Sequence, residues 1–135
     1  MKNESKIIGD KVALLKRARL QLLQLHKLFV DAERSNFEKQ SGQVSSGQFL
    51  NLLVNDTNFQ WLRKFSILIV EIDEMFDLDD GFTENMIEKH ISQIYSLINY
   101  DLTNADFEDK YRKFMQGNIE IAAKHNELKK LLLEG

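Results

Sequence analysis

The fold is decided by the stretch Phe59-Gln60-Trp61-Leu62-Arg63-Lys64-Phe65-Ser66-Ile67-Leu68-Ile69-Val70-Glu71-Ile72-Asp73-Glu74-Met75-Phe76. At about 100° per residue its apolar side chains form two adjacent lines, which predicts one helix with Ile67 and Val70 towards its back. The inner line is Trp61, Phe65, Leu68 and Ile72, and the line beside it is Leu62, Ile69 and Phe76. A helix that is apolar over most of its circumference must be covered by other parts of the chain. We therefore expect the remaining segments to pack around it.

Length and composition favour one globular domain over residues 1–135, with residues 1–6 as a disordered N-terminal tail. A chain of 135 residues that is 43% hydrophobic can bury its own core. Proline is absent, so nothing forces a kink in a long helix. Cysteine is also absent, which excludes disulfides and thiolate chemistry and fits a reducing compartment. No signal peptide or membrane span is apparent, and we expect a soluble cytoplasmic protein.

The periodicity predicts four long helices and one short helix. The short one begins with a capping box at Ser45 and Gln48, the same pattern recurs at Thr57 and Gln60 before the central helix, and Thr83 caps the helix after it. The last long helix is expected to continue across Gly117, with a loosened turn at this glycine as the alternative. The expected long helices run from Ile7 or Asp10 to Gln40, from Phe59 to Phe76, from the Thr83 cap to a boundary at Asp101-Leu102-Thr103, and from Ala105 to about Leu133. Short connections between them favour an all-α, antiparallel up-down four-helix bundle with one additional short helix.

Charge is segregated along the chain. Lys and Arg outnumber Asp and Glu in residues 1–40 and 110–135, while acidic residues dominate 41–109. Basic ends that pack against an acidic middle would complement each other inside the molecule. Nucleic acid is not an expected partner, because the protein is acidic overall and has no recognised binding motif.

Five polar side chains fall on or beside the apolar stripes and form the candidate polar core cluster: His26, Glu33, Asp73, His90 and His125. One hypothesis is a metal ion or small cofactor held by them, although the Glu-x-x-His pairs of di-iron bundles are missing. The alternative, which we favour, is that they are hydrogen-bonded structural groups, with His26 or His125 bonded to Glu33, Asp73 or Tyr111. No metal or cofactor is therefore predicted.

Other chemistry finds less support. The acidic turn before Glu84 is not an EF-hand, because placing Gly81 at loop position six puts Phe76, Leu78 and Ile87 where oxygen ligands are required. No nucleophile elbow or phosphate-binding loop occurs, so no catalytic residue is predicted and a non-enzymatic role is favoured.

An association surface is the favoured functional interpretation. A small bundle cannot cover a helix that is apolar nearly all round, so Trp61, Ile67 and Val70 are predicted to form an interface with a second copy or another protein. The alternative is that the short helix, residues 49–54, completes the cover.

Several strings of residues together carry a family resemblance: Leu25-His26-Lys27, Asp31-Ala32-Glu33-Arg34, Val44-Ser45-Ser46-Gly47, Phe59-Gln60-Trp61-Leu62-Arg63, Ile69-Val70-Glu71-Ile72-Asp73-Glu74, Tyr111 and His125. They resemble a family of small, uncharacterised bacterial all-helical proteins with no established activity. Relatives tend to have proline where Thr57 and Lys64 stand here. The resemblance implies a helical fold and a bacterial cytoplasmic setting, and it supplies no catalytic residues.

Overall fold

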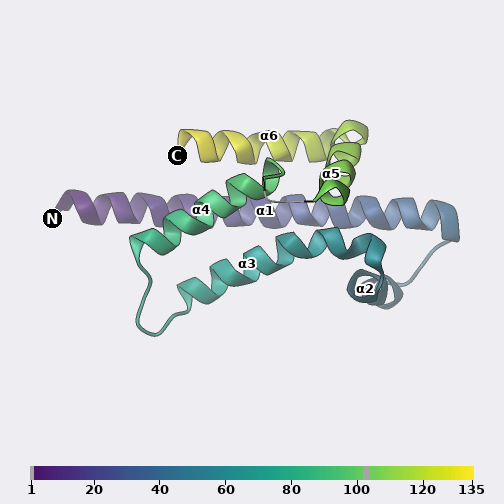
Figure 1. Cartoon of the computed structure of the whole chain (residues 1–135), viewed down its shortest axis with the longest axis horizontal. Helices are drawn as coiled ribbons and strands as arrows, with labels where there is room; N and C mark the ends of the chain where they lie inside the picture. Colours follow the sequence, from purple (N-terminus) through teal and green to yellow (C-terminus); the bar gives the residue numbers. More distant parts are fainter. Residues whose placement is uncertain (1, 102–103) are drawn as a thin grey trace.

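The computed structural model describes residues 2–101 and 104–135, and over these residues the protein is all-helical, as predicted (Figure 1). The expected boundary at Leu102 and Thr103 lies outside the described residues. The elements are α1 (Lys2–Ser41), α2 (Ser46–Asn55), the 3-10 helix η1 (Thr57–Leu62), α3 (Arg63–Phe76), α4 (Glu84–Ile98), α5 (Ala105–Gly117) and α6 (Ile119–Glu134).

Helix α1 is the spine of the molecule. It contacts α3, α4 and α6, while α3 also contacts α4 and α4 also contacts α6. Successive long helices alternate in direction along this spine, and the short α5 lies across them (Figure 1). The core therefore runs along one side of α1, where Leu15, Ala18, Leu22, Leu25 and Phe29 are fully buried.

Helix α1 begins earlier than predicted. It starts at Lys2, whereas the sequence pattern pointed to Ile7 or Asp10, and the first residue of the expected tail, Met1, lies outside the described residues. No proline interrupts its 40 residues, which span about 60 Å at 1.5 Å per residue. The helix closes just before Gly42, whose positive φ of 84° suits a residue without Cβ.

The central segment is not one α-helix, so the prediction of a single helix over residues 59–76 is wrong in its first turn. The Asp56 side chain accepts a hydrogen bond from the Asn58 backbone, and this cap starts a 3-10 turn ahead of α3. The tighter winding sends Phe59, Trp61 and Leu62 into the core. In α3 the predicted inner line is confirmed, since Phe65, Leu68 and Ile72 are buried.

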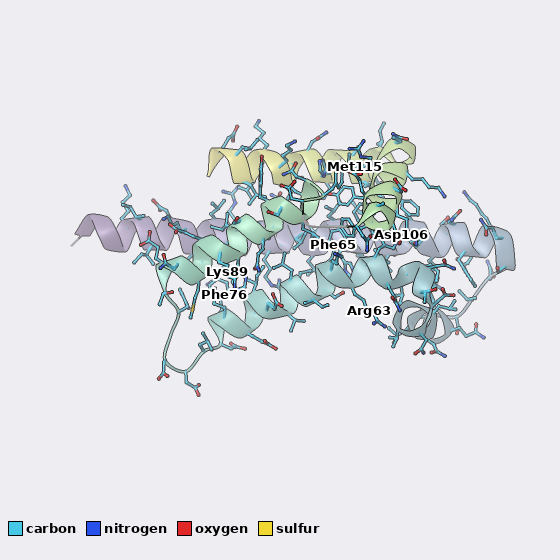
Figure 2. The ribbon with its side chains drawn as sticks, viewed as in Figure 1. Arg63, Phe65, Phe76, Lys89, Asp106 and Met115 are labelled. Atoms are coloured by element: carbon cyan, nitrogen blue, oxygen red, sulfur yellow. The ribbon has the colours of Figure 1, made fainter. Side chains whose placement is uncertain are left out.

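An aromatic cluster packs around the buried Phe29 ring. The Phe29 ring lies 5.0 Å from the Trp61 ring and 4.8 Å from the Tyr111 ring, measured between centroids. Phe65 packs against the same ring at 5.5 Å, from the side of α3 that faces α1 and α5 (Figure 2). Rings from α1, η1, α3 and α5 thus meet at one point, which ties four elements together.

The predicted continuous last helix is also wrong, because the chain turns between α5 and α6. Asn118 has φ −141° and ψ 112°, outside the helical region, and its side chain accepts hydrogen bonds from the Glu120 and Ile121 backbones. Gly117 is a poor helix former and Asn118 is a good N-cap, so the local preferences favour a stop followed by a new start. The break lets α5 run across the other helices and place Phe107 and Tyr111 in the aromatic cluster.

Helix α4 ends in a Schellman motif with tyrosine at the position that usually holds glycine. The Asp101 N–H donates to the Ser96 carbonyl at 2.9 Å, and the Tyr100 N–H donates to the Leu97 carbonyl at 3.3 Å. Tyr100 takes the left-handed conformation, with φ 65°. Its ring lies 5.0 Å from the Tyr111 ring, so the helix end is pinned to α5.

Candidate functional site

Glu33 is the most buried acidic side chain described. It is 6% exposed on α1, and Trp61 Nε1 donates a hydrogen bond of 2.9 Å to its Oε2. Burial raises the pKa of the Glu33 carboxyl, while the indole hydrogen bond and the charges of Lys110 and Lys113 lower it in part. An indole N–H can only donate, so this pair is not an acid-base relay.

A small pocket of about 220 Å³ opens beside Glu33. Its walls combine phenyl rings, amide side chains and two lysines: Asn36, Phe37, Gln40, Asn58, Phe59, Lys110, Lys113 and Phe114. Lys110 Nζ donates to the Asn58 carbonyl at 2.7 Å and pairs with Asp106 at 3.3 Å, so part of the rim is held by internal contacts. The pocket therefore belongs to the packing between α1, η1 and α5.

His125 and Tyr111 form the second buried polar pair. The Tyr111 hydroxyl lies 2.6 Å from His125 Nδ1, and His125 is 6% exposed. Burial lowers the pKa of His125, with Lys129 acting in the same direction, and burial raises the pKa of the Tyr111 hydroxyl. The phenol therefore donates to a neutral imidazole, which is the kind of structural hydrogen bond predicted for His125.

The other three candidates each have a separate partner. His26 stacks on Phe65 and its Nε2 lies 3.4 Å from Ser66 Oγ, while burial lowers the pKa of its imidazole. The two remaining groups form partly buried pairs, His90 Nδ1 with Gln93 Oε1 at 2.9 Å and Asp73 with Arg19 at 2.6 and 2.9 Å.

The structure does not bring the five candidate residues into one cluster. Each of these polar groups is directed at a different neighbouring element. Glu33 bonds to Trp61 of η1, His125 bonds to Tyr111 of α5, and Asp73 of α3 bonds to Arg19 of α1. In the part of the chain that the structure describes, no group of three or more His, Asp or Glu side chains is arranged to hold a metal ion. The five candidate residues therefore do not form a set of metal ligands in this geometry.

The basic first helix and the acidic middle do complement each other. Lys11 pairs with Glu84 at 2.6 Å and also with Glu88, and Arg19 makes the bidentate pair with Asp73. Sequence reasoning missed these partners, because the Lys11 pairs depend on the register between α1 and α4 and the Arg19 pair on the register between α1 and α3. Three contacts define the antiparallel register of α1 and α3 in the structure: Lys16 lies over the Phe76 ring, Arg19 pairs with Asp73, and His26 lies beside Ser66.

Of the three residues predicted for an interface, Ile67 and Val70 are exposed and Trp61 is buried. Ile67 and Val70 are 55% and 52% exposed on α3. Trp61 is only 4% exposed, because the 3-10 turn directs its indole to Glu33 and to the Phe29 ring. Trp61 is therefore part of the core and not of an outer surface.

An open groove of about 440 Å³ runs beside Ile67, between α3 and α4. Its floor is apolar and its rim is charged or polar: Lys64, Ile67, Leu68, Glu71, Lys89, Ser92, Gln93, Ser96, Leu97 and Asp101. Together with Val70, the groove makes a surface that we call the α3–α4 face. An apolar strip bordered by charges is the usual composition of a protein contact surface.

A comparison of the chain with protein-family models, with curated proteins and with solved structures finds no match. The resemblance to a bacterial helical family therefore stays a prediction. Among the helices of residues 2–101 and 104–135, none combines the length and the apolarity needed to cross a bilayer.

Proposed function

We propose that the protein is a non-enzymatic helical protein that acts through protein association at the α3–α4 face, with itself as the simplest partner. The proposal includes an up-down bundle of the four long helices α1, α3, α4 and α6 as the rigid support of that face. It also includes a bacterial cytoplasmic setting, for which the absence of cysteine is the support in the chain itself.

One observation carries the proposal: Ile67 and Val70 stand half in water on a helix whose other side is fully buried. Full burial of an aliphatic side chain of this size stabilises by about 1.5–3 kcal/mol, so covering the exposed halves would contribute about 1 kcal/mol for each residue. Since the groove beside them is apolar at its floor, a partner helix can cover both residues at once.

The test is sedimentation velocity of the purified protein over a concentration range from about 5 to 200 μM, where a contact of modest size is expected to form. The double variant Ile67→Lys/Val70→Lys should stay monomeric throughout, because two charges would have to be buried in the contact. Ile119→Lys is the matched control, since Ile119 is 87% exposed at the start of α6 and lies away from the face. Association that survives the double variant would refute the proposal.

A further inference from the structure

Four exposed side chains lie on one line along the outer side of α3. Arg63, Ile67, Val70 and Glu74 follow each other at spacings of four, three and four residues, and all four are exposed. At 100° per residue they fall within a strip about 60° wide, which is the seam of a two-helix contact. Arg63 stands at the α2 end of this strip (Figure 2).

The order of chemistry along the strip is cation, apolar, apolar, anion. If an identical helix approaches in the opposite direction, with its centre opposite the point between Leu68 and Ile69, each Arg63 meets the other copy's Glu74. In the same alignment each Ile67 meets the other copy's Val70. A parallel approach would instead put Arg63 beside Arg63 and Glu74 beside Glu74, which is unfavourable. The strip is thus complementary to itself in one orientation only.

A second charged pair on the flank of the strip obeys the same rule. Lys64 and Glu71 both line the α3–α4 groove, and their midpoint lies one residue from the midpoint of the strip. In an antiparallel pair of helices, residues on the same flank meet across the contact, so each Lys64 would approach the other copy's Glu71. Both charge pairs therefore favour the antiparallel orientation, in registers that differ by two residues, or about 3 Å along the helix.

The groups needed for these contacts are accessible in the isolated chain. Arg63 donates from one nitrogen to the Val54 carbonyl at the end of α2, and its guanidinium has five N–H donors in all. Lys64 Nζ lies 5.8 Å from the centre of the Phe107 ring, at the edge of the groove, and its side chain is long and flexible. Glu71 and Glu74 are exposed on α3.

We infer that the partner at the α3–α4 face is a second copy of this chain, bound about a two-fold axis that passes α3 between Leu68 and Ile69. The inference rests on the proposed function and adds the partner and its orientation. A two-fold contact uses the same patch on both copies, which is the symmetry that the strip shows. Three turns of helix bury less than the roughly 1,200 Å² of a standard interface, so the dimer is expected to dissociate in the micromolar range.

The test is charge reversal read out by sedimentation equilibrium at low salt, where screening is weak. Arg63→Glu and Glu74→Arg each place two like-charge pairs in the dimer, and each variant alone should raise the dimer Kd about tenfold. In an equimolar mixture of the two variants, both charge pairs become attractive again, and a mixed dimer should form with an affinity near that of the wild type. The double variant Arg63→Glu/Glu74→Arg should also recover.

Glu127→Arg on α6 is the control for the reversed charge, and far-UV circular dichroism with melting curves confirms that each variant is folded. An unchanged Kd in the single variants, or a mixture that does not recover, overturns the two-fold alignment. If association still depends on Ile67 and Val70 in that case, the proposed function stands without it. A wild type that stays monomeric across the concentration range removes both.

Discussion

Replacing Glu33 separates the contribution of a buried hydrogen bond from that of a buried charge. Glu33→Gln keeps an oxygen that can accept from Trp61 Nε1, whereas Glu33→Ala leaves this buried indole N–H without an acceptor. An unsatisfied buried donor costs about 1–3 kcal/mol, so the alanine variant should be less stable than the glutamine variant by that amount. For a two-state chain of this length the difference corresponds to about 4–11 °C in Tm.

The charge adds a pH dependence whose sign follows from burial. The folded pKa of Glu33 is raised above its ordinary value of 4.5, so the folded state holds the proton more tightly than the unfolded state. The stability that comes from this tighter proton binding at Glu33 is fully present below pH 4.5 and is lost as the pH rises through the folded pKa. Glu33→Gln has no such loss, and its stability relative to the wild type should therefore increase from pH 4.5 to pH 7.5.

Urea denaturation measures both effects, with Trp61, the only tryptophan, as the fluorescent probe and circular dichroism as a second probe. Glu127→Gln is the matched control, because Glu127 is 56% exposed and should change stability by less than about 0.5 kcal/mol. A glutamine variant as unstable as the alanine variant would refute this reasoning. It would mean that attraction between the ionised carboxylate and Lys110 or Lys113 outweighs burial.

Three further predictions concern the core, a buried histidine and the break before α6. Phe29→Ala should lower the free energy of unfolding by about 3–5 kcal/mol in a urea titration, because it empties the centre of the aromatic cluster, while Ile119→Ala should change it by less than about 0.5 kcal/mol. The His125 part of the stability should be complete above pH 6.5 and fall as the pH drops through its lowered folded pKa, so His125→Gln should flatten the pH profile of Tm between pH 7.5 and 5; an unchanged profile would contradict burial as the cause. Asn118→Ala should cost about 0.5–2 kcal/mol and Asn118→Ser much less, and equal melting temperatures would show that the cap contributes nothing.

Periodicity and local signals were enough to predict much of the fold. The all-helical class follows from apolar stripes at helical spacing, and the Ser45–Gln48 capping box and the Thr83 cap are confirmed because both depend only on residues within one turn. The inner line of α3 is confirmed for the same reason. Signals of this kind are local, so they survive without knowledge of tertiary packing.

The misses arise where two local options compete or where packing decides. At the start of the central segment, Thr57 predicted an α-helical start, but the Asp56 cap begins a 3-10 turn. Near the C-terminal end, the apolar stripe predicted one continuous helix, but Asn118 ends α5 and caps α6. The apolar periodicity of the sequence continues across Gly117 because α5 and α6 each bury one face, although against different neighbours.

The candidate cluster failed for a different reason. Helical periodicity says which residues share a face, but it carries no information on the rotation of one helix against another. Glu33 and His125 were correctly placed inside, and their partners were set by that rotation. Ile67 and Val70 could be predicted as the outer residues of α3, whereas the fate of Trp61 depended on the 3-10 turn.

The tyrosine at the end of α4 has a consequence for how this region tolerates substitution. A left-handed backbone costs an L-residue roughly 1–2 kcal/mol that glycine avoids, while the Tyr100 ring gains contacts with Tyr111 and with the Arg112 guanidinium, 5.1 Å from its centre. Glycine would relieve the backbone strain but lose the ring contacts. A β-branched residue would increase the strain and also lose the ring contacts. A half-buried position at a helix end that looks freely replaceable is thus restricted by both its backbone and its ring, and random mutagenesis should recover β-branched residues there least often.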